Sequence, residues 1–263
     1  MNTINGQKFR QMLVAGANRL EAEKKIVDEM NVFPVPDGDT GTNMSLTVTS
    51  AVKEILAIPS DSCGDIAKAL SSGALRGARG NSGVIVSQLF RGMSEALKGA
   101  EEVDAYLLTQ ALSRGVQTAY KAVMKPKEGT ILTVAKAAAA KAEETARETE
   151  DLCKVMEQAA LAAEDMLAKT PDLLPVLKEA GVVDSGGKGL TLMYRGYLEA
   201  LLREDDEIDP VMALGEGEKP KEEVRKTLYC VELAVSCTTA AKAEEVLPSL
   251  SADIKGLGES FDA

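Results

Sequence analysis

In the stretch Val35-Pro36-Asp37-Gly38-Asp39-Thr40-Gly41-Thr42-Asn43-Met44, an acidic loop runs into the start of a helix. Asp37 and Asp39 place two carboxylates on either side of a glycine, and prolines restrict the backbone that leads to them. From Asn43 onward, apolar residues recur at the spacing of a helix. Two hard oxygen ligands beside a helix N-terminus suit Mg²⁺ that carries a polyphosphate.

Other kinds of site fit this loop less well. Taken alone, Asp-Gly-Asp is typical of an ordinary acidic turn, but the prolines and the following helix favour a ligand site. An EF-hand loop that begins at Asp37 needs glycine at its sixth position and glutamate at its twelfth, where this chain has Thr42 and Val48. A phosphatase of the haloacid dehalogenase type has Asp-x-Asp-x-Thr after a buried strand, whereas Gly41 takes the fifth position here and prolines precede the motif.

The composition of the 263-residue chain excludes several classes of protein. Its net charge of −11 argues against a nucleic-acid partner, because phosphates would be repelled. It contains no histidine, which excludes Ser-His-Asp triads and histidine-based acid–base catalysis. The four cysteines form no C-x-x-C pair, and without a signal peptide or a membrane-spanning run they predict reduced thiols in a cytoplasmic protein.

Most of the chain has helical periodicity, which predicts an all-α fold for residues 1–202. About eight helices with short polar connections favour an up-and-down bundle or helical barrel, and aromatic residues are so few that its core must be aliphatic. Helices are expected at about residues 5–30, 65–75, 82–97, 129–148, 151–169, 171–180 and 189–202. Two more helices are expected to begin at residues 43 and 104.

The character of the sequence changes after residue 202. The charged stretch 203–226 contains prolines and glycines and is predicted to be a linker. Residues 227–236 alternate between apolar and other residues, which indicates a strand. Because one strand and a short helix do not bury a core, residues 227–263 are predicted to begin a second, α/β domain that is truncated.

Three further segments resemble ligand-binding loops because glycine, serine or threonine precedes a helix. Arg76–Gly83 offers glycines, Ser82 and two arginines to a phosphate, with a flexible helix connection as the equal alternative. In the segment Lys127–Thr130, the residues taken alone favour Thr130 simply as the N-cap of the following helix. Asp184–Gly189 is not a P-loop, since Gly189 stands where Walker A needs Ser or Thr. In an up-and-down arrangement alternate connections fall at the same end, so the acidic loop, Arg76–Gly83 and Asp184–Gly189 are expected to meet there if the number of helices between them is right.

Together these motifs resemble the nucleotide-binding domain of bacterial fatty acid kinase. The residues that carry the resemblance are Asn31 to Met44, Gly77 to Ile85, Gly129 to Leu132 and Val182 to Gly187. That domain is related to the ADP-binding L subunit of dihydroxyacetone kinase. The resemblance covers about residues 6–202 and implies an eight-helix up-and-down barrel, DhaL-like, with Mg²⁺ and ATP bound across one rim.

The resemblance also implies roles for single residues. Asp37 and Asp39 match metal-ligating aspartates for Mg²⁺, expected as two ions. Asn31 lies one residue from the position of a third aspartate and is the candidate third ligand. Arg79 is the candidate catalytic helper, with a solvent-facing or structural role as its alternative. Positions that match nucleotide-binding residues are Thr40, Asn43, Ser82, Gly83, Thr130, Asp184 and Gly186.

The implied reaction is phosphoryl transfer from ATP to a fatty acid carboxylate, which is ionised near neutral pH and needs no general base. The acyl chain would be presented by a separate fatty-acid-binding protein, and a homodimer is left open. Two alternatives remain. One is a dihydroxyacetone kinase L subunit, against which Thr40 counts because that enzyme has histidine there. The other is a non-catalytic sensor that binds nucleotide or a lipid chain inside the barrel.

Overall fold

The computed structural model describes residues 1–215, which are almost entirely helical. The all-α prediction is therefore confirmed for this part of the chain. The long helices are α1 (Gly6–Glu29), α2 (Thr40–Ala57), α3 (Cys63–Gly77), α4 (Gly80–Ala96), α5 (Ala105–Ala122), α6 (Ile131–Ala146), α7 (Leu152–Leu173) and α9 (Ser185–Leu201). The short elements are β1 (Thr3–Ile4), β2 (Val103–Asp104), α8 (Pro175–Ala180) and α10 (Met212–Gly215).

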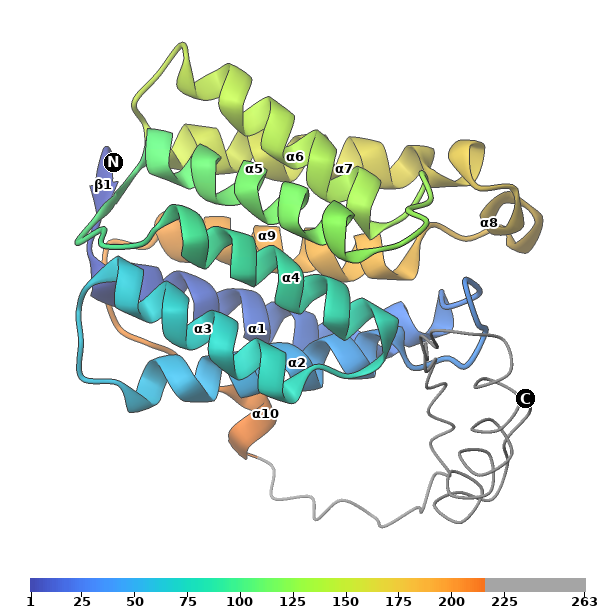
Figure 1. The fold of residues 1–263 in the computed structure, drawn as a ribbon, viewed down its shortest axis with the longest axis horizontal. Coiled ribbons are helices and arrows are strands. Elements are labelled where there is room, and N and C mark those ends of the chain that lie inside the picture. Colours follow the sequence, from blue (N-terminus) through green and yellow to red (C-terminus); the bar gives the residue numbers. More distant parts are fainter. Residues whose placement is uncertain (216–263) are drawn as a thin grey trace, which may run out of the picture. The chain divides into compact units, whose positions relative to one another are not determined.

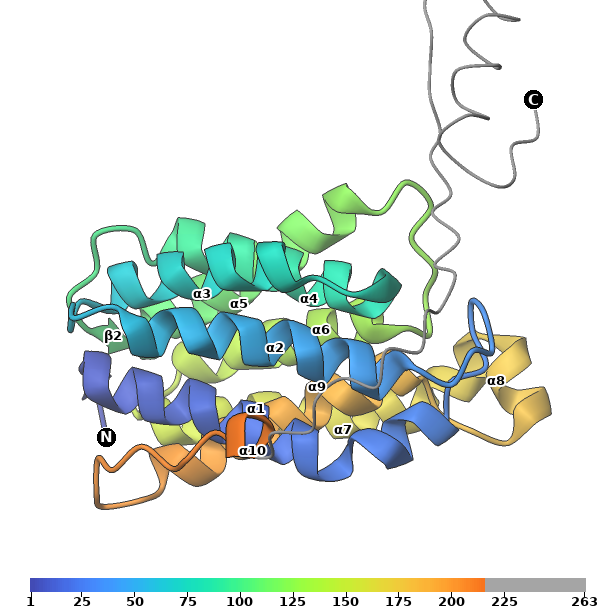
Figure 2. The same cartoon turned by 90° about the horizontal axis from the view of Figure 1, so that it is seen from below.

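The long helices form a closed ring in which neighbours in sequence are neighbours in space. Each long helix from α1 to α6 packs on the helix that follows it in sequence. α7 then packs on α9, and α9 packs on α1, which closes the ring (Figure 1). Consecutive helices run in opposite directions, as in an up-and-down bundle. Loops 30–39, 78–79, 123–130 and 174–184 consequently lie at one end of the barrel, here called the rim, on the right of Figures 1 and 2.

The core is aliphatic, as the composition predicts, with two buried tyrosines on α9. Leu20, Met44 and Ile55 are fully buried, and Tyr194 and Tyr197 pack with their ring centroids 6.0 Å apart. A cavity of about 20 Å³ remains between α4, α5 and α9. That volume holds about one water molecule, so this cavity has no room for an acyl chain.

Two helices begin earlier than the apolar periodicity indicates. α2 begins at Thr40 rather than Asn43, because the Asp39 carbonyl already accepts the Asn43 N–H at 2.8 Å. α9 begins at Ser185 rather than Gly189, because the Asp184 side chain accepts the Gly187 N–H at 2.7 Å and caps the helix. Small residues fill both first turns and give no periodic signal.

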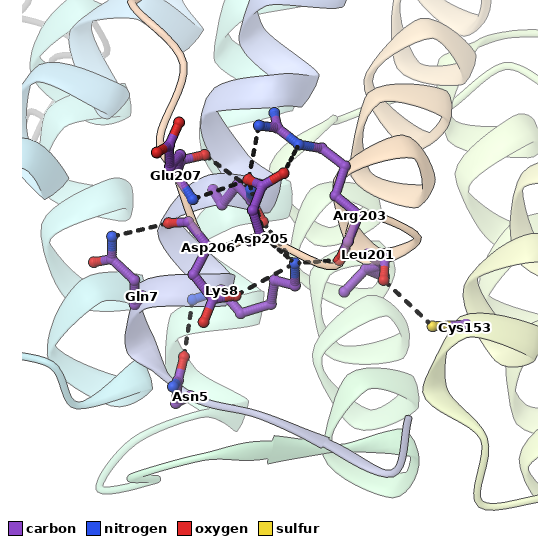
Figure 3. A network of polar contacts seen from close by, with 10 residues as sticks. Asn5, Gln7, Lys8, Cys153, Leu201, Arg203, Asp205, Asp206 and Glu207 are labelled. Atoms are coloured by element: carbon purple, nitrogen blue, oxygen red, sulfur yellow. Dashed lines mark hydrogen bonds and ion pairs between the residues drawn. The ribbon is translucent and has the colours of Figure 1, made fainter.

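Residues 203–212, here called the strap, lie along α1 rather than forming the linker that we expected from residue 203 (Figure 3). Four polar side chains of α1 hold the strap: Gln7, Lys8, Gln11 and Asn18. The buried Lys8 ammonium donates to the carbonyl oxygens of Arg203 and Asp205, each at 2.8 Å. This part of the predicted linker belongs to the helical unit, while residues 216–226 and the predicted second domain lie outside the described residues.

Replacing Lys8 by Ala is expected to destabilise the helical unit by about 2–3 kcal/mol, the range for hydrogen bonds made by a charged donor. The substitution removes the ammonium donor from the Arg203 and Asp205 carbonyls, of which only the Asp205 carbonyl keeps another donor, Nε2 of Gln11. Urea unfolding measures the free energy, and amide exchange should rise in the strap. Lys68→Ala, at an exposed position of α3, is the matched control and should change little. Equal stabilities of the two variants would contradict this role of Lys8.

Candidate functional site

Four loops meet at the rim, the three that the sequence analysis expects together and also the Lys127–Thr130 loop, and each leads into the N-terminus of a helix. They precede α2, α4, α6 and α9 (Figure 1). Helix N-termini present backbone N–H groups without intrahelical partners, and the helix dipole adds positive potential. The rim therefore brings the acidic loop together with several sites that favour anions.

The acidic loop places Asp37 at the surface and Asp39 at the N-cap of α2. Gly38 between them has a φ of +67°, a conformation that residues with side chains rarely adopt. The Asp39 side chain does not cap α2. Asp28, at the end of α1, caps α2 instead. Its carboxylate accepts hydrogen bonds from the backbone N–H of Thr42, at 2.9 Å, and from the hydroxyl of Thr42, at 2.8 Å.

Asp28 is a residue of the site that the sequence analysis missed. It lies inside the last turn of a long amphipathic helix, where a charged residue normally faces solvent. Only the fold brings it to the first turn of α2. The side chain that caps α2 is therefore that of Asp28 and not that of Asp39.

Asn31 is buried beneath the acidic loop and makes four hydrogen bonds. Its Nδ2 group donates to the carbonyl of Val35 at 3.0 Å and to Oδ1 of Asp37 at 2.6 Å. Its Oδ1 atom accepts from the hydroxyls of Thr40, at 2.7 Å, and Ser185, at 3.5 Å. Asn31 thus links the acidic loop to the first turns of both α2 and α9.

The second loop packs directly on α2. The backbone N–H of Arg79 donates to Oγ1 of Thr47 at 3.1 Å. Gly80 has a φ of +57°, and a Cβ atom added there would lie 2.5 Å from Nδ2 of Asn43. A Cβ atom at Gly83 would lie 2.3 Å from Oγ1 of Thr47. The glycines are therefore needed for the close approach of α4 to α2, which places Asn43 between the acidic loop and the second loop.

The N-terminus of α4 is open to the rim. Arg79 occupies its N-cap position without a capping side-chain hydrogen bond, and Ser82 is half-buried in its first turn. The Arg79 side chain is exposed, and within residues 1–215 it takes part in no ion pair. Arg76, by contrast, pairs with Glu54 at 2.7 Å. The first amides of α4 and the Arg79 guanidinium are thus placed to meet an anion.

The third loop ends at Thr130, which is half-buried at the N-cap of α6. The expectation that its side chain caps the helix is wrong, because its hydroxyl donates to the Lys127 carbonyl at 2.8 Å instead. Gly129 has a φ of +82° and packs against the end of α7. This loop therefore joins the rim through contacts with α7 rather than through a capping bond.

Asp184, from the fourth loop, is buried between two helix N-termini rather than displayed on the surface of the rim. Burial raises the pKa of its carboxyl to about 6, while hydrogen bonds from the backbone N–H groups of Gly187 and Ile131 oppose that rise. A carboxylate that caps α9 and also meets the first amide of α6 holds the two helices together. Gly186 lies beside it, with a Cβ position 3.2 Å from Ile131.

The raised pKa of Asp184 predicts a pH-dependent stability. Because the folded-state pKa of about 6 exceeds the ordinary value of 3.8, the stabilisation is present below pH 3.8 and is lost as the pH rises through 6. The free energy of unfolding of the wild type minus that of Asp184→Asn should fall by about 2 kcal/mol between pH 4 and pH 7. Urea unfolding across this range measures it, and a difference that does not vary with pH would contradict the assignment.

The oxygen atoms of the acidic loop suit a hard cation that brings further ligands with it. Within residues 1–215, no group of three or more His, Cys, Asp or Glu side chains is placed to hold a metal ion. Asp37 and Asp39 supply carboxylates of the kind that Mg²⁺ prefers. Mg²⁺ commonly binds through one or two carboxylates, water and the phosphates of a nucleotide. The donor set and the open helix N-termini therefore fit Mg²⁺ together with a polyphosphate.

No helix of the described residues 1–215 has the length and apolar character that crossing a membrane requires.

The sequence of this chain is similar to those of curated proteins from Staphylococcus aureus. An uncharacterized protein of Staphylococcus aureus (strain bovine RF122 / ET3-1) is 53% identical over 201 residues, which cover 76% of this chain and 37% of that protein. A protein of strain USA300 gives the same figures. The chain therefore spans well under half the length of the curated relatives it matches.

Solved structures with the same fold belong to the dihydroxyacetone kinase of C. freundii. The native form matches with a TM-score of 0.54 and 17% identity over 73% of this chain and 34% of that one. The complex with AMP-PNP and Mg²⁺ matches with a TM-score of 0.53 and 17% identity, over 73% of this chain and 33% of that one. At this identity, the likeness establishes the fold alone.

The family is established by a direct match of the sequence. The model of the DAK2 domain covers residues 34–199, from the acidic loop to the last turn of α9. This range includes three of the rim loops in full and residues 34–39 of the loop 30–39. The chain therefore belongs to the DAK2 domain family.

Proposed function

We propose that the helical unit is an ATP-dependent kinase domain that binds Mg²⁺ and ATP at the rim. The observation that carries the proposal is that Asp37 and Asp39 lie at the start of α2, where Asn43 packs against Gly80 at the uncapped N-terminus of α4. The carboxylates suit the cations, and the helix N-termini suit the phosphates. The complex of the C. freundii dihydroxyacetone kinase with AMP-PNP and Mg²⁺ supports this ligand for the fold.

Each rim residue has a proposed role. Asp37 and Asp39 hold Mg²⁺, for which we propose two ions, and the exposed Arg79 guanidinium offsets charge on the transferred phosphoryl group. Residues at the starts of α2, α4, α6 and α9 meet the nucleotide: Asn43, Ser82, Gly83, Thr130 and Gly186. Thr40, which the resemblance places among the nucleotide-binding residues, instead uses its buried hydroxyl to bond Asn31. Asp184 stabilises the first turn of α9, because its buried carboxylate caps that helix.

The acceptor that we propose is the carboxylate of a fatty acid held by a separate fatty-acid-binding protein. Such a carboxylate is ionised near neutral pH, so its attack needs no general base, and the chain has no histidine to supply one. Bound Mg²⁺ supplies the positive charge that phosphoryl transfer requires. The side chains of the rim then have to position the nucleotide and keep Asp37 and Asp39 in place.

Two further observations bear on the alternatives. The 20 Å³ cavity between α4, α5 and α9 does not favour a lipid sensor that stores an acyl chain there. Thr40 is buried and donates to Asn31, so it is part of the packing under the acidic loop. A dihydroxyacetone kinase L subunit, in which the resemblance places histidine at this position, is therefore the weaker candidate.

The test is a phosphoryl-transfer assay on the full-length protein. ATP is supplied with a fatty acid loaded on a fatty-acid-binding protein, or with dihydroxyacetone, and acyl phosphate is trapped with hydroxylamine. The proposal expects hydroxamate from the fatty acid and no transfer to dihydroxyacetone. Transfer to dihydroxyacetone would favour the rival kinase, and nucleotide binding without transfer to either acceptor would favour a sensor.

A further inference from the structure

We infer that Asn31 is a positioning residue that fixes the Asp37 carboxylate for Mg²⁺, rather than a metal ligand itself. This inference rests on the proposed function, because it assigns a role at the same nucleotide site. It replaces the expectation, drawn from the resemblance, that Asn31 is the third ligand.

The orientation of the Asn31 amide is fixed by its partners. The Val35 carbonyl only accepts hydrogen bonds, so the atom that meets it at 3.0 Å must be Nδ2. The same nitrogen donates to Oδ1 of Asp37 at 2.6 Å. A donor group therefore faces the acidic loop, and a nitrogen that donates to a carboxylate does not coordinate a cation.

The oxygen of the Asn31 amide is engaged on the other side. It accepts the hydroxyl of Thr40 at 2.7 Å and lies 3.5 Å from the hydroxyl of Ser185. Asn31 is only 6% exposed, so its oxygen faces the protein interior rather than the rim surface. Both ends of the amide are thus used to join three segments: the acidic loop, α2 and α9.

The charge of the site explains why an amide serves here. A carboxylate at position 31 would accept the two hydroxyls but would lack the donor for Val35 and Asp37. It would also stand against the Asp37 carboxylate at hydrogen-bond distance, and one of two such neighbouring carboxyls is driven to take up a proton. Asn31 instead holds Oδ1 of Asp37 with a donor, so the second carboxylate oxygen is oriented toward the surface of the loop.

Asn31→Asp gives opposite results under the two roles, and this makes it the central test. A ligand at position 31 would gain charge, so Mg²⁺-dependent binding of a non-hydrolysable ATP analogue would stay equal or tighten. A positioning residue loses its donor, so the Mg²⁺ concentration needed for half-maximal binding should rise at least tenfold. Calorimetric titration at several Mg²⁺ concentrations measures this. Asn2→Asp, the same change at an exposed position in the N-terminal segment, is the matched control.

The double variant Asn31→Asp with Asp37→Asn keeps the test valid if Asn31→Asp alone unfolds. It exchanges the two groups, so a hydrogen bond between positions 31 and 37 is retained with one carboxylate, as in the wild type. The inference expects a melting temperature above that of Asn31→Asp alone, because the hydrogen bond between positions 31 and 37 is restored, with Mg²⁺-dependent binding still lost. Binding retained by the double variant, or unchanged Mg²⁺ dependence in Asn31→Asp, would overturn it. Failure of the wild type to bind would instead overturn the proposed function.

Discussion

Replacing Asp37 and Asp39 together by Asn is expected to lower phosphoryl transfer by the full-length protein about 10³-fold. Metal ions contribute several kcal/mol of charge stabilisation, and each 1.36 kcal/mol is a factor of ten in rate. Asp37 and Asp39 lie in the loop that leads into α2, which packs against the uncapped N-terminus of α4. Because Asp28 already caps α2, the substitutions should leave the helix intact.

The control for this prediction is Asp165→Asn, which makes the same chemical change at an exposed position of α7. Its activity should equal that of the wild type, and all variants should retain the helical circular dichroism signal. Full activity in the Asp37 and Asp39 double variant would contradict the assignment of the acidic loop as the metal site.

Gly41→Ala is expected to destabilise the protein by about 3 kcal/mol or more, the range for overpacking at a tight helix contact. A Cβ atom at this position would lie 2.1 Å from the carbonyl oxygen of Lys24 and 2.9 Å from Cβ of Val27. The obstacle is helix backbone, which has little freedom to move. Since α1 and α2 must separate, the acidic loop between them should shift and nucleotide binding should weaken.

Gly186→Ala is the matched comparison, because Gly186 also lies in the first turn of a helix. The added Cβ atom meets Cβ of Ile131 at 3.2 Å, and the alanine improves helix propensity by about 1 kcal/mol, so the net change in stability should stay within about 1 kcal/mol. Urea unfolding of both variants measures the difference. Equal losses in the two variants would show that the contact between α1 and α2 is not the constraint.

The helical barrel was predictable because its signals are local and repeated. Apolar residues at helical spacing mark the long helices, and the helix expected from residue 104 begins after Asp104, whose side chain accepts the Leu107 N–H at 2.7 Å. The β1–β2 pair was not predicted, since its strands of two residues leave no periodic pattern. The strap was missed for another reason: its charged sequence is that of a linker, and only the buried Lys8 shows where it is held.

The candidate site was predictable in its loops but not in its contacts. The motifs around Asp37, Gly80 and Asp184 indicated ligand-binding loops, and the alternation of helices placed them at one end. Sequence spacing could not show that Asp28 caps α2, because the two segments meet only in three dimensions. Nor could it show that Asp184 is a buried cap or that the Asn31 amide turns its nitrogen toward Asp37.

The most direct measurement is a calorimetric titration of the wild-type protein with a non-hydrolysable ATP analogue, with and without Mg²⁺. Binding that requires Mg²⁺, and that is lost when Asp37 and Asp39 are replaced by Asn, is the predicted result. Absence of binding to the correctly folded protein at any Mg²⁺ concentration would contradict the proposal that the rim is a Mg²⁺–nucleotide site.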